Sequence, residues 1–323
     1  MPFEILVTGH TFERHFLEVL SARGYSVEFH SEHLPEPELK KALENKDAFI
    51  LGGVEYVSAE TLEANSTLKV IAVAAVGYQS YVDLEAATRK GILVTNVPNA
   101  NARATAEMTI SLMTSLWRKV AYLSSEVKKG NWPDDVVAGT LQGAVLGIIG
   151  AGAIGSIVAE IAAFGLGMQV LYYSRSAKPE LEARTRARRV SLGELLSESD
   201  VVSLHVPITD ETRGLIGEAE LALMKPTAIL VNTARPQVVR AQALSKALQT
   251  GSIAGCAMDG YYDEPPNELD QYGLLNLPDD IFLVTPHVGY LTRESIYKMS
   301  ELAVEGVIAI LEERPWQYVV NPR

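Results

Sequence analysis

Cysteine is nearly absent from the sequence: Cys256 is the only one in 323 residues. A lone cysteine excludes an internal disulfide bond and any metal cluster that needs several thiolates. Because Cys256 lies in an apolar run, residues 253–258, we expect its thiol to be buried and unreactive. The sequence also has no apolar stretch as long as a membrane span, and its first residues lack the basic and apolar segments of a signal peptide. We therefore expect a cytoplasmic protein.

Positive charge is scarce as well. The chain has 28 lysines and arginines against 40 aspartates and glutamates, which gives a net charge of −12. Such a surface disfavours nucleic acid and anionic membranes as partners, although a local basic site stays possible. Four of the 6 histidines, His10, His15, His30 and His33, lie early in the chain without metal-ligand spacing, and we expect structural or surface roles for them. His205, at the end of an apolar run, is expected to be a wall residue. We expect no metal, no nucleic acid and no membrane among the partners.

What the sequence does contain is a repeated alternation of short apolar strands and amphipathic helices. At 323 residues the chain is long for one hydrophobic core, so two domains are the default expectation. In the first domain we expect strands at residues 4–8, 26–30, 48–51, 68–75 and 92–95, and helices at residues 12–23, 37–44 and 83–90. This order predicts a parallel sheet with helices on both faces. Ligands of such sheets bind at the C-terminal strand ends, here the loops at Gly52-Gly53 and Val76-Gly77.

A second series follows a crossing near Pro98 and one long helix over residues 102–129. The apolar residues of that helix cover more than one face, which favours burial between domains or between subunits and, with it, a homodimer. Six further strands are expected at residues 145–149, 168–173, 201–205, 228–232, 253–258 and 282–284. A last helix, residues 293–312, is expected to pack back on the first domain. The predicted domains are therefore 1–98 with 290–323, and 99–289.

Three glycines stand between the strand 145–149 and an apolar-faced helix, in the spacing G-x-G-x-x-G. The first, Gly150, permits a tight turn; the second, Gly152, lets backbone approach a pyrophosphate; the third, Gly155, lets the helix pack closely on the strand. The N-terminus of the helix then faces the phosphates. The motif in this setting predicts a dinucleotide-binding domain.

The end of the next strand decides which dinucleotide is favoured. A site for NAD usually has an aspartate or glutamate about 20 residues after the glycines, which binds the ribose 2′-hydroxyl. Here that position holds Ser174, Arg175 and Ser176, and no carboxylate occurs before Glu180. An arginine flanked by hydroxyls attracts a 2′-phosphate through charge-assisted hydrogen bonds. We therefore favour NADP(H) over NAD(H); stacking of Arg175 on the adenine of either cofactor is the alternative.

Three polar stretches each follow a predicted strand of the second domain, and they carry Arg235, Glu264 and His287. Because parallel strands end at one edge of the sheet, these side chains are expected to face the same crevice. Taken singly, each side chain also suits a structural role, as an ion-pair arginine, a solvated acid or a turn histidine. Together, at matching strand ends, they predict an active site.

With these stretches the chain resembles the D-isomer-specific 2-hydroxyacid dehydrogenase family. The resemblance covers nearly the whole chain and includes residues 76–78, residues 91–98, the glycine motif, His205-Val206-Pro207 and the three polar stretches. The segment 174–176 is similar to that of the NADPH-preferring glyoxylate/hydroxypyruvate reductases in the family. The resemblance implies an α/β fold of two doubly wound parallel-sheet domains, a flavodoxin-like substrate domain and a Rossmann NAD(P)-binding domain.

The resemblance further implies an oxidoreductase that reduces a small 2-keto acid, with glyoxylate or hydroxypyruvate first, to the D-2-hydroxy acid. In this reaction His287 exchanges the proton, Glu264 orients its ring and favours the imidazolium form, and Arg235 binds the carboxylate and polarises the carbonyl. Asp259 is expected to bind the nicotinamide carboxamide. The implied cofactor-binding residues are Gly150, Gly152, Ala153, Ile154, Gly155, Ser174, Arg175, Ser176, Val206, Pro207, Thr233, Ala234, Arg235, Asp259, His287 and Gly289. The implied substrate-binding residues are Gly53, Val76, Gly77, Arg235 and His287.

The chain departs from the family pattern at several places. Pro236 and Arg240 stand where the family has glycine and aspartate, which removes an N–H, favours extended backbone at Arg235 and removes a helix cap. The loop 77–83 is longer than usual by one residue, and Tyr290 replaces a glycine. Five tyrosines are expected to crowd the substrate site: Tyr78, Tyr81, Tyr261, Tyr262 and Tyr290.

Two alternatives stay open from the sequence. Pro236 and Arg240 also suit a dinucleotide-sensing binding protein, similar to the transcriptional corepressors that share this fold. A family dehydrogenase that acts on another small anion, as phosphite dehydrogenases do, is the second alternative. The presence of Arg235, Glu264 and His287 together favours the reductase.

Overall fold

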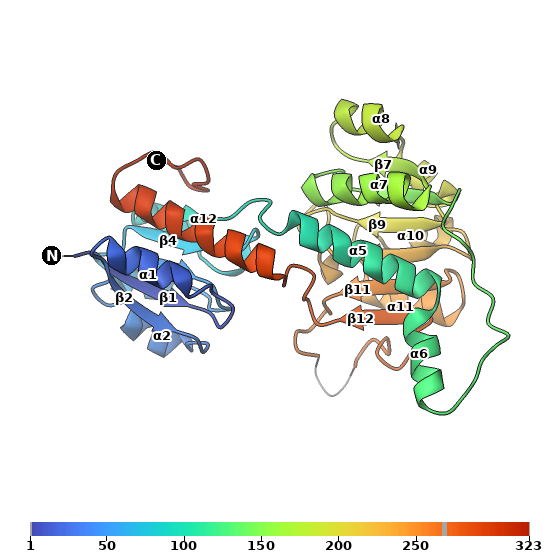
Figure 1. The fold of residues 1–323 in the computed structure, drawn as a ribbon, viewed down its shortest axis with the longest axis horizontal. Helices are drawn as coiled ribbons and strands as arrows, with labels where there is room; N and C mark the ends of the chain where they lie inside the picture. Colours follow the sequence, from blue (N-terminus) through green and yellow to red (C-terminus); the bar gives the residue numbers. More distant parts are fainter. Residues whose placement is uncertain (1, 267–269, 323) are drawn as a thin grey trace. The chain divides into compact units, whose positions relative to one another are not determined.

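The computed structural model describes residues 2–266 and 270–322, which form two α/β units around separate parallel sheets (Figure 1). The first unit comprises Met1–Asn101 and Leu291–Arg323, and the second comprises Ala102–Tyr290. The expected fold class of two parallel-sheet α/β domains is confirmed. In the described part of the chain, no helix combines the length and the apolarity that crossing a membrane requires.

The sheet of the first unit has the strand order β2-β1-β3-β4-β5, the flavodoxin-like order. Its strands are β1 (Glu4–Thr8), β2 (Ser26–His30), β3 (Ala48–Leu51), β4 (Val70–Val73) and β5 (Leu93–Thr95). Its helices are α1 (His15–Ala22), α2 (Glu36–Ala42), α3 (Ala59–Ala64), α4 (Leu84–Arg89) and α12 (Arg293–Leu311). The wholly apolar strands β3 and β4 are buried at the centre, and α12 packs against both. The C-terminal helix therefore completes the core of the first unit (Figure 1).

The sheet of the second unit has the strand order β12-β11-β10-β9-β6-β7-β8, which is the Rossmann order with one more strand. Its strands are β6 (Val145–Ile149), β7 (Gln169–Tyr173), β8 (Arg188–Arg189), β9 (Val201–Leu204), β10 (Ile229–Asn232), β11 (Gly255–Asp259) and β12 (Phe282–Thr285). Its helices are α5 (Ala102–Trp117), α6 (Val120–Lys128), α7 (Ala153–Leu166), α8 (Pro179–Thr185), α9 (Leu192–Glu198), α10 (Glu218–Leu223) and α11 (Ala241–Gln249). Cys256 is fully buried in β11, and this burial raises the pKa of its thiol, as expected for an unreactive cysteine.

Three details of the predicted pattern were wrong. The second sheet has seven strands rather than six, because β8 is two exposed arginines with no apolar signal. The long helix is two helices, since Lys119 between them adopts left-handed backbone at φ 54°. Helix α3 was not predicted, because six residues are too few to show a helical period. Its start was visible in the sequence, where Ser58 caps the helix by accepting the N–H of Thr61.

Candidate active site

The glycine motif forms the turn between β6 and α7. Gly150 has φ +97°, and a Cβ added there would lie 2.7 Å from the carbonyl oxygen of His205. A Cβ on Gly155 would lie 2.3 Å from the carbonyl oxygen of Gly150. At Gly152, by contrast, a Cβ would meet no atom within 4 Å. The packing of the unit therefore requires Gly150 and Gly155, whereas Gly152 borders open space at the N-terminus of α7.

The loop after β7 lies next to this turn, because the N–H of Gly150 donates to the carbonyl oxygen of Tyr173 at 2.9 Å. Ser174 is half-buried, while Arg175 and Ser176 are exposed. No carboxylate of the described residues pairs with Arg175, so its guanidinium is available to an anion. The structure thus brings the two predicted cofactor loops together at one sheet edge.

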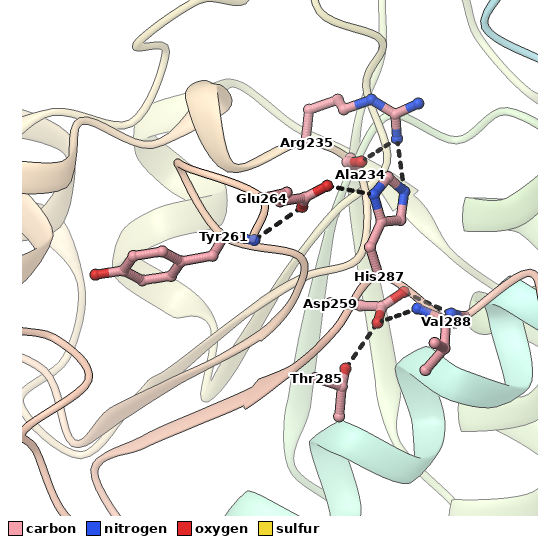
Figure 2. Close-up of polar contacts among 9 residues, drawn as sticks. Ala234, Arg235, Asp259, Tyr261, Glu264, Thr285, His287 and Val288 are labelled. Carbon is pink, nitrogen blue, oxygen red and sulfur yellow. Dashed lines mark hydrogen bonds and ion pairs between the residues drawn. The ribbon is translucent and has the colours of Figure 1, made fainter. Parts of the chain in front are cut away.

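His287, which follows β12, is at the centre of the polar contacts in Figure 2. Its Nδ1 lies 2.9 Å from Oε2 of Glu264, and its Nε2 lies 3.5 Å from Nη1 of Arg235. The three residues come from the ends of three different strands of the sheet. The predicted grouping of Arg235, Glu264 and His287 is therefore present in the structure.

Glu264 is held on both carboxylate oxygens. Oε2 faces His287, and Oε1 accepts the N–H of Tyr261 at 2.9 Å (Figure 2). Partial burial acts to raise the pKa of this carboxyl, but the hydrogen bond and charge of His287, the Tyr261 N–H and the charge of Arg235 outweigh burial and lower the pKa below 4.5. The ionised carboxylate can only accept hydrogen bonds, so Nδ1 of His287 carries a proton and donates it.

Pro236 does not prevent the Arg235 side chain from reaching His287. Its backbone is extended, with φ −144° and ψ 136°, as expected for the residue before a proline. Pro236 begins a short 3₁₀ turn, Pro236–Val238, where a missing N–H leaves no hydrogen bond unmade. The side chain of Asn232 closes the preceding turn by donating to the carbonyl oxygen of Arg235 and accepting the N–H of Ala234. The guanidinium therefore still reaches His287.

Arg240 points away from this group of residues. Its Nε donates to the carbonyl oxygen of Gly214 at 3.4 Å, and its side chain packs on Gly214 and Gly217. Helix α11 has no side-chain N-cap at Arg240, as expected from the sequence. The positive charge that Arg240 adds is therefore directed to the loop after β9 rather than to Arg235.

Asp259, at the end of β11, has a backbone-holding role that no sequence pattern indicated. It is 4% exposed and accepts hydrogen bonds from the Thr285 hydroxyl (2.7 Å) and from the N–H groups of Val288 (2.9 Å) and Gly289 (2.7 Å) (Figure 2). His287 itself has left-handed backbone at φ 55°, which is costly for a residue with a side chain. The three hydrogen bonds hold the turn in this conformation.

Other predicted residues border the same edge. The hydroxyl of Thr233 lies 2.7 Å from that of Thr109 in α5, whose own proton goes to the carbonyl oxygen of Thr105. Thr109 therefore accepts from Thr233, which leaves the Thr233 oxygen free to accept a further hydrogen bond. Burial lowers the pKa of His205 to about 3, so its ring is neutral, and Nε2 of the ring lies 2.8 Å from the Ser203 hydroxyl. The backbone carbonyl of His205, rather than the ring, lies against Gly150.

Of the five tyrosines expected to crowd the substrate site, Tyr290 lies beside His287. Its ring lies edge-on to His287, with centroids 6.2 Å apart and an interplanar angle of 87°. Tyr261 and Tyr262 instead pack into the core of the second unit, where the Tyr262 hydroxyl donates to the carbonyl oxygen of Val239. Tyr78 and Tyr81 pack likewise against the core of the first unit.

In the first unit, the predicted substrate-binding residues lie after β3 and β4. The side-chain amide of Asn96 donates to the carbonyl oxygen of Val76 at 2.8 Å. Within the described residues, the N–H groups of Val76 and Gly77 have no acceptor. Gly53 lies against the buried carboxylate of Glu55. Unpaired N–H groups suit the binding of a carboxylate, so these residues keep their predicted role as a hypothesis.

Comparison with known proteins identifies the relatives of this chain. The NAD-binding domain model of the D-isomer specific 2-hydroxyacid dehydrogenases matches residues 110–289. Glyoxylate reductase of Aeropyrum pernix is 40% identical over 98% of this chain and 95% of its own. That of Thermococcus litoralis is 40% identical over 85% of this chain and 83% of its own.

Solved structures agree with these matches. A protein of Thermus thermophilus is similar with a TM-score of 0.88 and 37% identity, covering 98% of this chain and 100% of its own. A glyoxylate reductase from Paecilomyes thermophila is similar with a TM-score of 0.85 and 31% identity, covering 99% of this chain and 98% of its own.

Proposed function

The chain belongs to the D-isomer-specific 2-hydroxyacid dehydrogenase family, and on that premise we propose that it uses NADPH to reduce a small 2-keto acid to the D-2-hydroxy acid. Glyoxylate and hydroxypyruvate are the first candidates, since glyoxylate reductases are among its relatives. The observation that carries the proposal is the position of His287 between Glu264 at 2.9 Å and Arg235 at 3.5 Å.

His287 is the proposed proton donor. Glu264 engages Nδ1, so Nε2 is the nitrogen that exchanges a proton with the substrate. In reduction, charged His287 donates this proton to the carbonyl oxygen and becomes neutral; in oxidation it takes the proton back. Arg235, beside Nε2, binds the substrate carboxylate and stabilises negative charge on the carbonyl oxygen. A nicotinamide dinucleotide, when bound, supplies the hydride.

The residues of the second unit fit such a dinucleotide. The open space at Gly152 and the first-turn N–H groups of α7 suit a pyrophosphate. Ser174, Arg175 and Ser176 would hold the adenosine ribose, and the guanidinium of Arg175 favours a 2′-phosphate over a hydroxyl. Thr233, with a free acceptor oxygen, would face the nicotinamide side.

The test is an absorbance assay of reduced nicotinamide with NADPH or NADH across 2-keto acids from glyoxylate to phenylpyruvate. We expect turnover with NADPH and preference for the smallest acids. Binding of both cofactors without turnover would contradict the enzyme and favour the dinucleotide sensor. Turnover only with a different small anion would favour the other alternative.

The cofactor preference has its own test. Replacing Ser174→Asp together with Arg175→Ile places a carboxylate at the ribose and removes the guanidinium. We expect the ratio of kcat/KM for NADPH over NADH to fall by at least about tenfold, because hydrogen bonds to a charged phosphate are lost and repulsion is added. An unchanged ratio would remove the argument for NADP(H). The homodimer and the cytoplasmic location stay predictions from the sequence.

A further inference from the structure

An arginine of the edge strand holds the loop that follows β7. Nη2 of Arg189 donates hydrogen bonds to the carbonyl oxygens of Ser174 and Arg175, each at 2.9 Å. Arg189 belongs to β8, where it pairs with Tyr172 of β7, so it lies beside the loop although it is 14 and 15 residues away in sequence. The unpredicted strand thus carries a direct contact to the loop that favours NADP(H).

These two hydrogen bonds determine which way the peptide groups of the loop face. In a trans peptide the C=O and the N–H point in opposite directions. Because Arg189 binds the carbonyls of residues 174 and 175, the N–H groups of Arg175 and Ser176 point away from Arg189. Neither of these N–H groups has an acceptor among the residues that the structure describes. Two successive unpaired N–H groups form the kind of concavity that binds anions.

The segment around this loop carries a net positive charge, which also favours an anionic ligand. Residues 174–189 contain six basic side chains and two acidic ones, a net charge of +4 in a chain whose total is −12. Arg184 and Arg188 each pair with a glutamate. Within the described part of the chain, Arg175 and Arg189 pair with no carboxylate. The positive charge of this loop is therefore not neutralised by the protein itself.

We propose that Arg189 is a specificity-determining residue for the 2′-phosphate of NADP(H). It keeps the two carbonyl oxygens away from the phosphate and turns the next two N–H groups toward it. A 2′-hydroxyl gains little from this arrangement, because hydrogen bonds to a charged group are roughly twice as strong as neutral ones. The inference rests on the proposed use of NADP(H) and assigns to Arg189 the positioning of that site.

The neighbouring Arg188 is a matched control. It lies in the same strand and is also exposed, but successive side chains of a strand point to opposite faces. Its Nη2 lies 3.2 Å from Oε2 of Glu198, whereas the carbonyl oxygens of Ser174 and Arg175 are bound by Arg189. Arg188→Met and Arg189→Met therefore remove the same charge from adjacent positions, and only the second removes the carbonyl contacts.

The experiment is isothermal titration of the full-length protein with adenosine 2′,5′-bisphosphate and with 5′-AMP, which differ by the 2′-phosphate. We expect the parent and Arg188→Met to bind the bisphosphate at least about tenfold more tightly, and Arg189→Met to lose most of that preference while binding 5′-AMP as before. In the assay, Arg189→Met should raise KM for NADPH by a similar factor and leave kcat and KM for NADH unchanged.

The outcomes separate the two proposals. If Arg189→Met keeps the parental preference for the bisphosphate, the role of Arg189 is wrong and the use of NADP(H) stands. If the parent itself does not distinguish the two nucleotides, the use of NADP(H) is wrong. Equal losses with both nucleotides, or with NADPH and NADH alike, would also overturn the specificity role. Arg189→Gln is the second variant if methionine lowers the thermal midpoint.

Discussion

The two halves of the ligand-binding edge of the second unit are built differently. At the ends of β10, β11 and β12, the functional groups are side chains that hydrogen-bond to one another, with His287 between Glu264 and Arg235. At the ends of β6 and β7, the available groups are backbone N–H groups, open space, as at Gly152, and the exposed guanidinium of Arg175. We call these the catalytic half and the dinucleotide half.

The difference follows from what each half is proposed to do. Proton transfer requires one nitrogen at a defined place, and the hydrogen bond of Nδ1 to Glu264, with Arg235 3.5 Å from Nε2, gives the His287 ring that place. A dinucleotide carries its charge over several phosphates, which many weak donors can share. Substitutions in the catalytic half should therefore change kcat, and those in the dinucleotide half should change cofactor affinity.

The largest effect is expected from His287→Asn in the catalytic half. The amide cannot donate a proton at neutral pH, so kcat should fall by about 10²- to 10⁴-fold, the usual range for loss of a general acid. Binding of NADPH, followed by its fluorescence, should be nearly unchanged. His15→Asn, at an exposed position of α1, is the control and should keep parental turnover. A His287→Asn enzyme with most of its activity would show that another group donates the proton.

A smaller effect is expected from glycines in the dinucleotide half. Gly152→Ala adds a methyl group in open space, so stability should be unchanged, while the Kd of NADPH rises at least about tenfold because the methyl group occupies the cofactor's place. Gly155→Ala places a methyl group 2.3 Å from the carbonyl oxygen of Gly150 and should cost about 1–3 kcal/mol of folding free energy.

Titration calorimetry and thermal unfolding measure these two quantities for both glycine variants. We expect the two variants to differ: Gly152→Ala should lose NADPH binding and keep full stability, whereas Gly155→Ala should lose stability. If Gly152→Ala binds NADPH as the parent does, the dinucleotide does not lie at this turn.

The smallest effect is expected from Glu264→Gln, and it depends on pH. A neutral amide can still hold Nδ1 of His287, but the charge-assisted part of the bond is lost, so kcat at pH 7 should fall roughly fivefold. Because the pKa of Glu264 in the folded protein is below 4.5, the parent keeps its carboxylate ionised past that pH. The ratio of parent to variant activity should therefore shrink as the pH falls below 4.5, where the parent carboxylate begins to be protonated.

The contribution of Glu264 to folding stability should also be lost as the pH falls. A carboxyl whose pKa is lowered on folding stabilises the protein above its ordinary pKa of 4.5 and loses that contribution as the pH falls through the lower, folded value. Denaturation of parent and Glu264→Gln from pH 7 to pH 3.5 measures the difference. A difference that grows toward low pH would contradict the lowered pKa.

Local patterns were enough to predict most strands and the residues at their ends. The apolar runs of β3, β4, β6, β10 and β11 mark buried parallel strands, and the polar residues that follow them must lie at one sheet edge. Pro236 also fixed a local property, the extended backbone of Arg235, before any contact was known. Such features depend on neighbours in sequence, which is why they can be read from it.

Contacts between distant residues could not be predicted in this way. No local pattern separates Arg188 from Arg189, yet one faces Glu198 and the other holds the loop at Ser174. In the same way, nothing near Asp259 in sequence indicates that it holds the turn after His287, far along the chain. These roles depend on which strands lie side by side.

By itself, the sequence determined the alternation of strands and helices, the glycine turn and the set of polar residues at the strand ends, because backbone sterics and side-chain periodicity act over a few residues. Only the tertiary structure decided how those polar residues are used. Burial made Asp259 and Thr109 partners of backbone and hydroxyl groups far along the chain, and the parallel pairing of β7 with β8 gave Arg189 its place. A buried or edge-lying polar group takes the partner that packing brings within about 3 Å, and packing is a property of the whole unit.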